Sequence, residues 1–155
     1  MVDLHTHSNI SDGDFSPSLL IKEAVKQGLR AIALTDHDTI NGLESARTAA
    51  LAEATAENFR FIPGIEININ WTGGKSPQGV PGIGHGGEFH LLGLGINSPS
   101  PAFRAAVDEL SRRREARNRE ILDKMQELSI DASWEEVSAL SGGHSLGRPH
   151  FAASW

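Results

Sequence analysis

Short apolar runs alternate with longer segments of helical periodicity through the first half of the chain. Val2 to His5 predicts a short strand. Arg30 to Thr35 (R-A-I-A-L-T) is a compact apolar run, which is typical of a strand covered on both faces. Phe59 to Asn70 predicts a third strand, which Pro63-Gly64 is expected to interrupt. The first half therefore predicts three strands.

Two helices are expected between these strands. The first begins at Ser16-Pro17, an N-cap residue followed by proline at the first helical position, and ends at Gly28. The buried face of this helix is predicted to be apolar: Leu20, Ile21, Ala24 and Val25. The second helix is Ala-rich and extends from about Leu43 to Glu57. The β-α-β-α-β order predicts an α/β fold, with a parallel sheet or barrel and right-handed crossovers.

A long loop and a fourth strand are expected next. Trp71 to Gly87 is rich in Gly and Pro and has no periodicity, which is typical of a functional or disordered loop. Glu88 to Leu94 predicts a strand that pairs with the preceding one. We expect the α/β body to occupy residues 1–98.

The rest of the chain has a helical pattern. Pro101 to Leu128 predicts one long helix. Trp134 to Leu140 predicts a shorter helix that begins with a capping box, in which Glu136 follows Ser133 by three residues. We therefore expect residues 99–155 to form a helical subdomain.

Composition narrows the class of protein. The 155 residues are 39% hydrophobic, enough for a core without disulfides, and contain no cysteine. Disulfide frameworks, thiolate metal sites and cysteine nucleophiles are excluded, and a cytoplasmic location is expected. Neither a signal peptide nor a membrane span is visible. The net charge of −6 argues against non-specific binding to duplex DNA.

Histidines and carboxylates recur where the predicted strands end. His5 and His7 are two residues apart, so their side chains point to the same face of a strand. Further ligand-type residues follow on later segments: Asp12, His37, Glu66 and His90. Active sites in α/β sheets and barrels lie at the C-terminal ends of strands. Mixed His and carboxylate ligands suit manganese, iron or zinc, and two or three such ions would bind a phosphate.

Each residue also has a simpler interpretation. The His5 and His7 pair could lie at the surface, and Asp12 beside a glycine could be turn chemistry. Asp36 and Asp38 could cap the next helix, which we favour for at least one of them. His90 alone would count as a core or surface histidine. Their joint placement on five segments is what favours a metal site.

Two arginines interrupt the apolar stripe of the long helix, Arg114 and Arg117. Their stems could pack while their charged groups reach solvent. Alternatively, the helix crosses the mouth of the site, and one guanidinium, that of Arg117, binds a phosphate. His85 and His144 are expected at the surface.

Several motifs together resemble those of the PHP (polymerase and histidinol phosphatase) superfamily. They are H-T-H-S-x-x-S-D-G at 5–13, T-D-H-D-T at 35–39, G-I-E-I at 64–67 and H-L-L-G-L at 90–94. Two later motifs, W-E-E-V at 134–137 and G-R-P-H at 147–150, resemble its bacterial branch of nucleotide phosphatases and RNA 5′-exonucleases. The resemblance covers essentially the whole chain.

The resemblance implies a distorted seven-stranded β/α barrel with a helical insertion and three metal ions. The implied ligands are His5 and His7 for the first metal, Glu66 as a bridge, His90 for the second metal, and Asp12 with His37 for the third. Arg148 and His150 would contact the substrate phosphate, which a metal-bridging hydroxide would attack.

The resemblance also implies further ligands in later strands, which do not occur before Trp155. We therefore expect this sequence to be the N-terminal part of a longer enzyme whose C-terminal remainder completes the site, and to bind metal poorly alone. The leading hypothesis is a metal-dependent phosphoester hydrolase that acts on nucleotides such as nucleoside 3′,5′-bisphosphates, or on short RNA. The alternatives are a histidinol-phosphate phosphatase and a non-catalytic binding domain.

Overall fold

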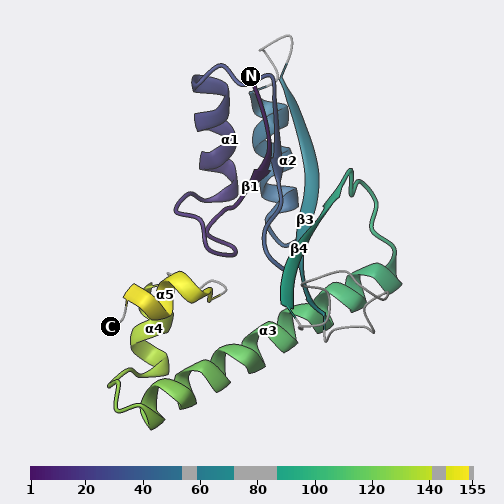
Figure 1. The fold of residues 1–155 in the computed structure, drawn as a ribbon. Coiled ribbons are helices and arrows are strands. Elements are labelled where there is room, and N and C mark those ends of the chain that lie inside the picture. The colour runs from purple at the N-terminus through teal and green to yellow at the C-terminus, as the bar shows by residue number, and fades with distance from the viewer. Residues whose placement is uncertain (54–58, 72–86, 141–145, 154–155) are drawn as a thin grey trace, which may run out of the picture.

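The computed structural model describes residues 1–53, 59–71, 87–140 and 146–153, and Figure 1 shows the arrangement of their helices and strands. The strands are β1 (Val2–Thr6), β2 (Ala31–Leu34), β3 (Arg60–Trp71) and β4 (Gly87–Leu94). The helices are α1 (Pro17–Lys26), α2 (Leu43–Ala52), α3 (Pro101–Glu127), α4 (Trp134–Leu140) and α5 (Arg148–Ala153). Sequence patterns predicted each of these elements except α5. His85 and His144 lie outside the described residues.

The four strands form one sheet in the order β1-β2-β3-β4. The first three strands are parallel, as predicted. The predicted pairing of β4 with β3 is also confirmed, and the structure shows that it is antiparallel. The expected interruption at Pro63-Gly64 is wrong, because β3 is continuous and changes partner there. Pro63 is paired with Leu34 of β2, and Gly64 with Leu94 of β4. Proline is accommodated because its extended backbone fits a strand and its carbonyl accepts hydrogen bonds from Gly95 N and Ile96 N at 2.8 and 2.9 Å.

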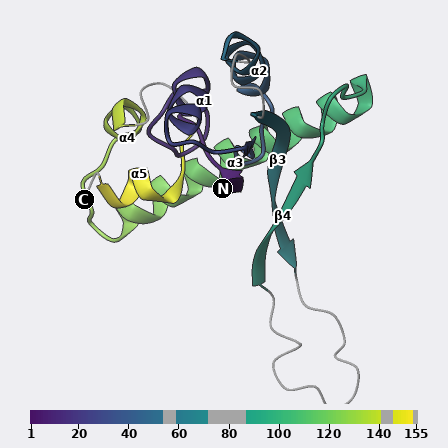
Figure 2. The same ribbon diagram turned by 90° about the horizontal axis from the view of Figure 1, so that it is seen from above.

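Helices α1 and α2 lie side by side along the sheet (Figures 1 and 2). The Ser16 side chain caps α1 by accepting a hydrogen bond from Leu19 N, and Gly28 after the helix has φ 73°. The core between helices and sheet consists of Ile21, Ala24, Ile32, Leu34, Leu43, Ala46 and Ala49. This core packs α1 and α2 against β2, and the polar residues that follow the C-terminal end of β2 lie outside it.

A second apolar cluster lies in the C-terminal part of the chain. It consists of Leu122, Ala132, Val137, Leu146 and Phe151. The capping box of α4 is confirmed, since the Ser133 hydroxyl donates to Glu136 Oε2 at 2.7 Å and accepts from Glu136 N at 3.2 Å. None of the helices in the described ranges combines the length and apolar character needed to cross a membrane. The division at residues 98 and 99 and the seven-stranded barrel stay predictions.

Candidate metal centre

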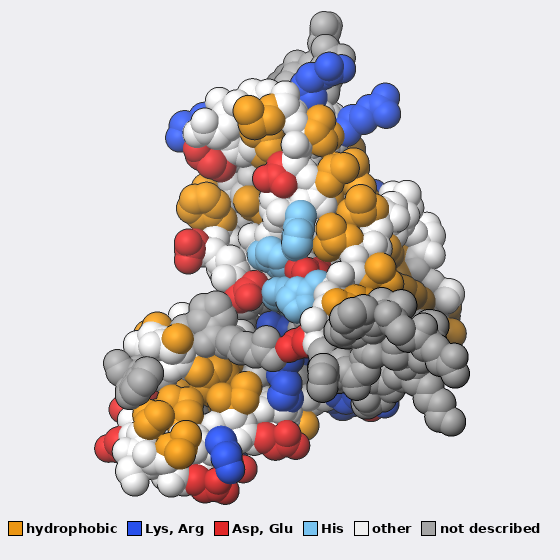
Figure 3. Space-filling view, viewed as in Figure 1, with side chains coloured by type: hydrophobic (Ala, Val, Ile, Leu, Met, Phe, Trp, Pro, Cys, Tyr) orange, Lys and Arg blue, Asp and Glu red, His pale blue; other side chains and the backbone are white. Residues whose placement is uncertain are grey.

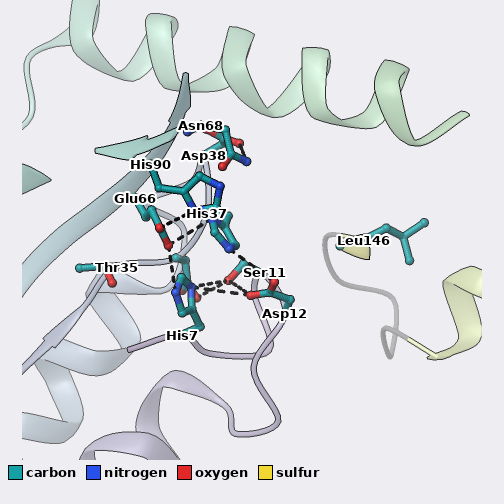
Figure 4. A network of polar contacts seen from close by, with 12 residues as sticks. His7, Ser11, Asp12, Thr35, His37, Asp38, Glu66, Asn68, His90 and Leu146 are labelled. Carbon is teal, nitrogen blue, oxygen red and sulfur yellow. Dashed lines mark hydrogen bonds and ion pairs between the residues drawn. The ribbon is translucent and has the colours of Figure 1, made fainter. Parts of the chain in front are cut away.

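The carboxylate of Glu66 is the centre of a cluster of imidazoles. Glu66 is buried on β3, and four histidine side chains lie close to its carboxylate. Three of them, His7, His37 and His90, are labelled in Figure 4. Its Oε2 lies 3.0 Å from His5 Nε2, 3.0 Å from His7 Nε2 and 3.2 Å from His37 Nδ1. Its Oε1 lies 2.6 Å from His90 Nδ1. Residues separated by up to 85 positions therefore meet at one carboxylate.

Strand geometry explains this convergence. His5 and His7 both reach Glu66, as their spacing predicts, whereas the hydroxyl of the intervening Thr6 donates to Ala33 O at 2.6 Å. His37 lies three residues after the end of β2 and forms a parallel bridge with Glu66. His90 comes from the antiparallel neighbour β4. All four histidines therefore lie near the strand ends that the α1–α2 core leaves free.

Asp12 completes the cluster from the loop after β1. Its carboxylate lies 3.5 Å from His37 Nε2 and 3.7 Å from His7 Nδ1. The loop turns so tightly that a Cβ on Gly13 would lie 2.3 Å from His7 O. Only glycine fits this approach to the backbone.

The donor set fits metal ions. Three groups of three residues each have ligand atoms within 4.8 Å of one another: His5, His7 and Glu66; His7, Asp12 and His37; and His37, Glu66 and His90. Nitrogen and carboxylate ligands about 2.1 Å from an ion lie about 3 Å apart when adjacent. The nitrogen–oxygen distances within the cluster, 2.6 to 3.7 Å, are close to this spacing. His37 Nδ1 is buried and, although it lies 3.2 Å from Glu66 Oε2, it forms no hydrogen bond of suitable geometry with the described residues. A cation bound there would satisfy it.

Sequence and structure comparisons agree with this geometry. A family model of the PHP domain matches residues 3–148. The chain belongs to the PHP domain family. It is 33% identical to the 5′-3′ exoribonuclease Rnm of Salmonella typhimurium, over 97% of this chain and 46% of that protein. It is 28% identical to the 3′,5′-nucleoside bisphosphate phosphatase of Chromobacterium violaceum, over 97% of this chain and 47% of that protein.

Two solved structures share the arrangement of this PHP chain. One is an amidohydrolase from Chromobacterium violaceum with bound sulfate and no metal, with 28% identity and a TM-score of 0.79 over 99% of this chain and 48% of that one. The other is a proposed metal-dependent phosphoesterase from Bifidobacterium adolescentis, with 26% identity and a TM-score of 0.72 over the same shares. The chain spans about half the length of the curated relatives it matches.

Electrostatics lower the pKa of three candidate ligands of the PHP site, His7, Asp12 and Glu66. Burial and the nearby charge of His37 lower the pKa of His7. Burial would raise the pKa of Asp12, but a hydrogen bond and charge from His37, with the charge of His7, lower it to about 2. Burial would also raise the pKa of Glu66, but the hydrogen bond from His5, the charge of His37 and the hydrogen bond from His90 lower it. Metal ions bind these deprotonated forms.

Asp36 stabilises the loop that carries Asp12 through hydrogen bonds with Ser8 and Ser11. This buried carboxylate accepts hydrogen bonds from Ser8 N at 2.7 Å, Ser8 Oγ at 2.7 Å and Ser11 Oγ at 2.8 Å, and burial raises its pKa. The expectation that Asp36 or Asp38 caps the next helix is wrong. Gly42 is the N-cap of α2 and no side chain caps it, because both carboxylates have longer-range partners.

Arg114 and Arg117 of α3 line a cavity of about 190 Å³ beside the cluster. The cavity is lined by Asp12, His37, Asn68, Glu88, His90, Arg114 and Arg117. Arg117 Nη1 lies 3.4 Å from Glu88 Oε1, and its binding of phosphate stays a prediction. The expectation that charged groups reach solvent is wrong for Arg114, whose side chain is buried and whose Nη1 lies 3.3 Å from Asp38 Oδ2.

The G-R-P-H motif lies against the same site. A Cβ on Gly147 would be 3.1 Å from Asp12 Cβ and 3.4 Å from Arg114 Nη2. His150 Nδ1 accepts a hydrogen bond from Gly147 N at 2.9 Å. The side chain of Arg148 lies outside the described part of the chain, so phosphate binding by Arg148 and His150 stays a prediction. The sequence did not predict the pairing of Asp38 with Arg114. The available signal was the position of Arg114 within the apolar stripe of the long helix, where a buried arginine needs an acidic partner.

The histidines form one continuous patch at the surface (Figure 3). Acidic side chains adjoin this patch, and basic side chains lie directly below it in that view. The side chains of His5 and His90 are 49% and 40% exposed, whereas the side chain of Glu66 is 2% exposed. The cluster is therefore open on the side of these two imidazoles.

Proposed function

We propose that this chain is the metal-binding part of a phosphoester hydrolase that acts on nucleotides such as nucleoside 3′,5′-bisphosphates, or on short RNA. The observation that carries the proposal is the convergence of four imidazoles and Asp12 around buried Glu66. A carboxylate with only a structural role is satisfied by fewer hydrogen-bond donors than the four imidazole nitrogens that lie within 3.2 Å of Glu66. Membership of the PHP domain family supports the same chemistry.

The residues divide into three groups of ligands for two or three divalent ions. His5 and His7 would hold one ion, His90 a second and Asp12 with His37 a third, with Glu66 between them. When bound, manganese, iron or zinc supplies the Lewis acidity that activates water and neutralises phosphate charge. Asp36 fixes the loop that carries Asp12 through Ser8 and Ser11.

The cavity beside the cluster is suited to an anionic substrate. Its lining joins two arginines to the histidines of the site. Arg117 would orient a substrate phosphate from α3, and Arg148 and His150 would do so from α5. The nucleotide or RNA class of substrate is supported by the names of the relatives, an exoribonuclease and a nucleoside bisphosphate phosphatase.

Metal content and phosphate release test the proposal. The natural protein that carries this sequence would be purified in Mn²⁺, and its bound metal would be compared with that of the variant Glu66→Gln and the exposed control Glu109→Gln. We expect metal in the wild type and the control but not in Glu66→Gln. Absence of metal from all three proteins would refute the metal site.

Substrate class is tested on the natural protein that carries this sequence. Phosphate release from a nucleoside 3′,5′-bisphosphate would be compared with release from histidinol phosphate and with shortening of 5′-phosphorylated RNA. We expect turnover of the bisphosphate or the RNA. Preference for histidinol phosphate, or metal binding without turnover, would favour one of the alternatives instead.

A further inference from the structure

Asp38 joins the end of β2 to β3 in an unusual backbone conformation. Its φ is 53°, in the left-handed region that few residues other than Gly, Asn and Asp adopt. Its backbone N–H donates to Glu66 O at 2.8 Å. Its carboxylate accepts hydrogen bonds from Asn68 N at 3.0 Å and Asn68 Nδ2 at 2.9 Å. Asp38 therefore holds His37, its neighbour in sequence, in register with Glu66.

Helix α3 contacts the same residue from the other side. The Ser111 hydroxyl donates to Asp38 O at 2.7 Å, and Arg114 Nη1 donates to Asp38 Oδ2 at 3.3 Å. Both charged side chains of this ion pair are 6% exposed. A buried charge that loses its partner is strongly unfavourable, so the two side chains depend on each other.

The contacts extend to the segment that precedes α5. Leu146 O accepts hydrogen bonds from Arg114 Nε at 3.2 Å and from Asn118 Nδ2 at 2.8 Å. Gly147, the next residue, packs against Asp12. A continuous set of buried polar contacts therefore connects β3, the residue after His37, α3 and the loop of Asp12.

We propose that Asp38 is a positioning residue whose ion pair with Arg114 couples the docking of α3 to the geometry of the metal centre. The inference rests on the proposed metal site. Neither Asp38 nor Arg114 belongs to the candidate ligands, so the pair acts through His37, Glu66 and Asp12. Because coupling is reciprocal, metal binding should stabilise the docked α3, and docking should strengthen metal binding.

Hydrogen exchange of the metal-free chain tests the docking contact. Arg114→Met removes the charge and keeps a long apolar stem, and Ser111→Ala is a milder variant in case Arg114→Met does not fold. We expect both to accelerate exchange at residues 37–40 and 66–68 as well as at 111–118. The matched control is Glu109→Gln, which removes exposed ion pairs of the same helix with Arg112 and Arg113. Acceleration confined to α3 would overturn the proposal.

Mn²⁺ titration tests the link to the metal centre. We expect Arg114→Met to weaken Mn²⁺ binding by about tenfold, the size typical of residues that support metal ligands. Mn²⁺ should also slow exchange at 111–118 in the wild type but not in Arg114→Met. Wild-type affinity in a folded Arg114→Met variant would overturn the coupling. Failure of the wild-type natural protein that carries this sequence to bind Mn²⁺ would instead refute the proposed metal function.

Two substitutions at Asp38 separate charge from backbone conformation. Asp38→Asn removes the negative charge but keeps a residue that tolerates the left-handed backbone conformation. Asp38→Ala removes the charge and also places a residue that disfavours this conformation. We expect Asp38→Asn to retain more Mn²⁺ affinity than Asp38→Ala, measured well below the unfolding temperature of each. Equal affinity in both variants and the wild type would contradict a positioning role.

Discussion

His90 Nδ1 lies 2.6 Å from Glu66 Oε1, although the two residues come from antiparallel strands and are 24 positions apart. The other carboxylate oxygen of Glu66 faces three further imidazoles within 3.2 Å. The two oxygens of the Glu66 carboxylate therefore connect His90 of β4 with the three histidines that lie on or just after β1 and β2. This relationship makes Glu66 the residue on which the candidate centre most depends.

Glu66→Gln should weaken Mn²⁺ binding by more than about 100-fold, because a neutral amide replaces the carboxylate that two of the three ligand groups share. Calorimetric titration with Mn²⁺ measures this loss. Glu109→Gln should bind as the wild type does. An unchanged affinity in Glu66→Gln would show that Glu66 is not a ligand.

Gly13→Ala should reduce both stability and Mn²⁺ affinity, because its Cβ would meet His7 O at 2.3 Å and displace the backbone of a ligand. We expect a loss of about 1–3 kcal/mol in the free energy of unfolding. The control is Gly28→Ala, which has no atom near its Cβ but has φ 73°. It should lose about 1 kcal/mol and keep its metal affinity. Urea unfolding and Mn²⁺ titration of both variants distinguish the two effects.

Asp36→Asn should destabilise the chain by about 1–3 kcal/mol, because an amide cannot accept all the hydrogen bonds that Ser8 and Ser11 donate to the carboxylate. Urea unfolding of the metal-free protein measures the change. Asp14→Asn, at an exposed position of the same loop, should leave stability unchanged. Equal stability of the two variants would contradict a supporting role for Asp36.

Stability of the metal-free chain should fall as the pH falls. The folded pKa of His7 lies below its ordinary value of 6.5, so the unfolded chain takes up the proton first, and this contribution is lost as the pH falls below 6.5. The contribution of Asp12 is present above its ordinary pKa of 3.8 and is lost as the pH falls toward about 2.

Urea unfolding in a chelator at several pH values between 7 and about 4 checks the upper part of this range. His7→Asn should reduce the slope just below pH 6.5, because asparagine does not titrate. The raised pKa of Asp36 acts in the opposite sense, since it favours proton uptake by the folded chain. Stability that rises on acidification from pH 7 would contradict the expected order of proton uptake.

Arg117→Ala should raise the KM for a nucleotide substrate by about tenfold in the natural protein, with a smaller effect on kcat, if Arg117 binds the substrate phosphate from the cavity wall. Arg113→Ala removes an exposed arginine of the same helix and should change neither constant. Steady-state kinetics of the two variants test whether Arg117 binds the substrate. An unchanged KM in Arg117→Ala would show that it does not and that its role is the ion pair with Glu88.

Local patterns were sufficient to predict most elements. Apolar runs, the Ser16-Pro17 start of α1 and the capping box of α4 all appear in the structure, because they depend on neighbours within a few residues. Motifs at strand ends also identified the side chains that meet at Glu66. Two elements deviated: α2 ends at Ala52, before the expected Glu57, and α5 was not predicted.

The sequence by itself determined the four strands, the helices other than α5 and the histidines and carboxylates that meet at one site, since periodicity and the order of elements can be read along the chain. Only the tertiary structure decided that β3 changes partner at Pro63, that Asp36 binds Ser8 and Ser11, and that Asp38 pairs with Arg114 across 76 positions. These contacts depend on which polar groups become buried together. A buried polar group takes the nearest complementary partner in space, and that partner has no periodic relation to it along the chain.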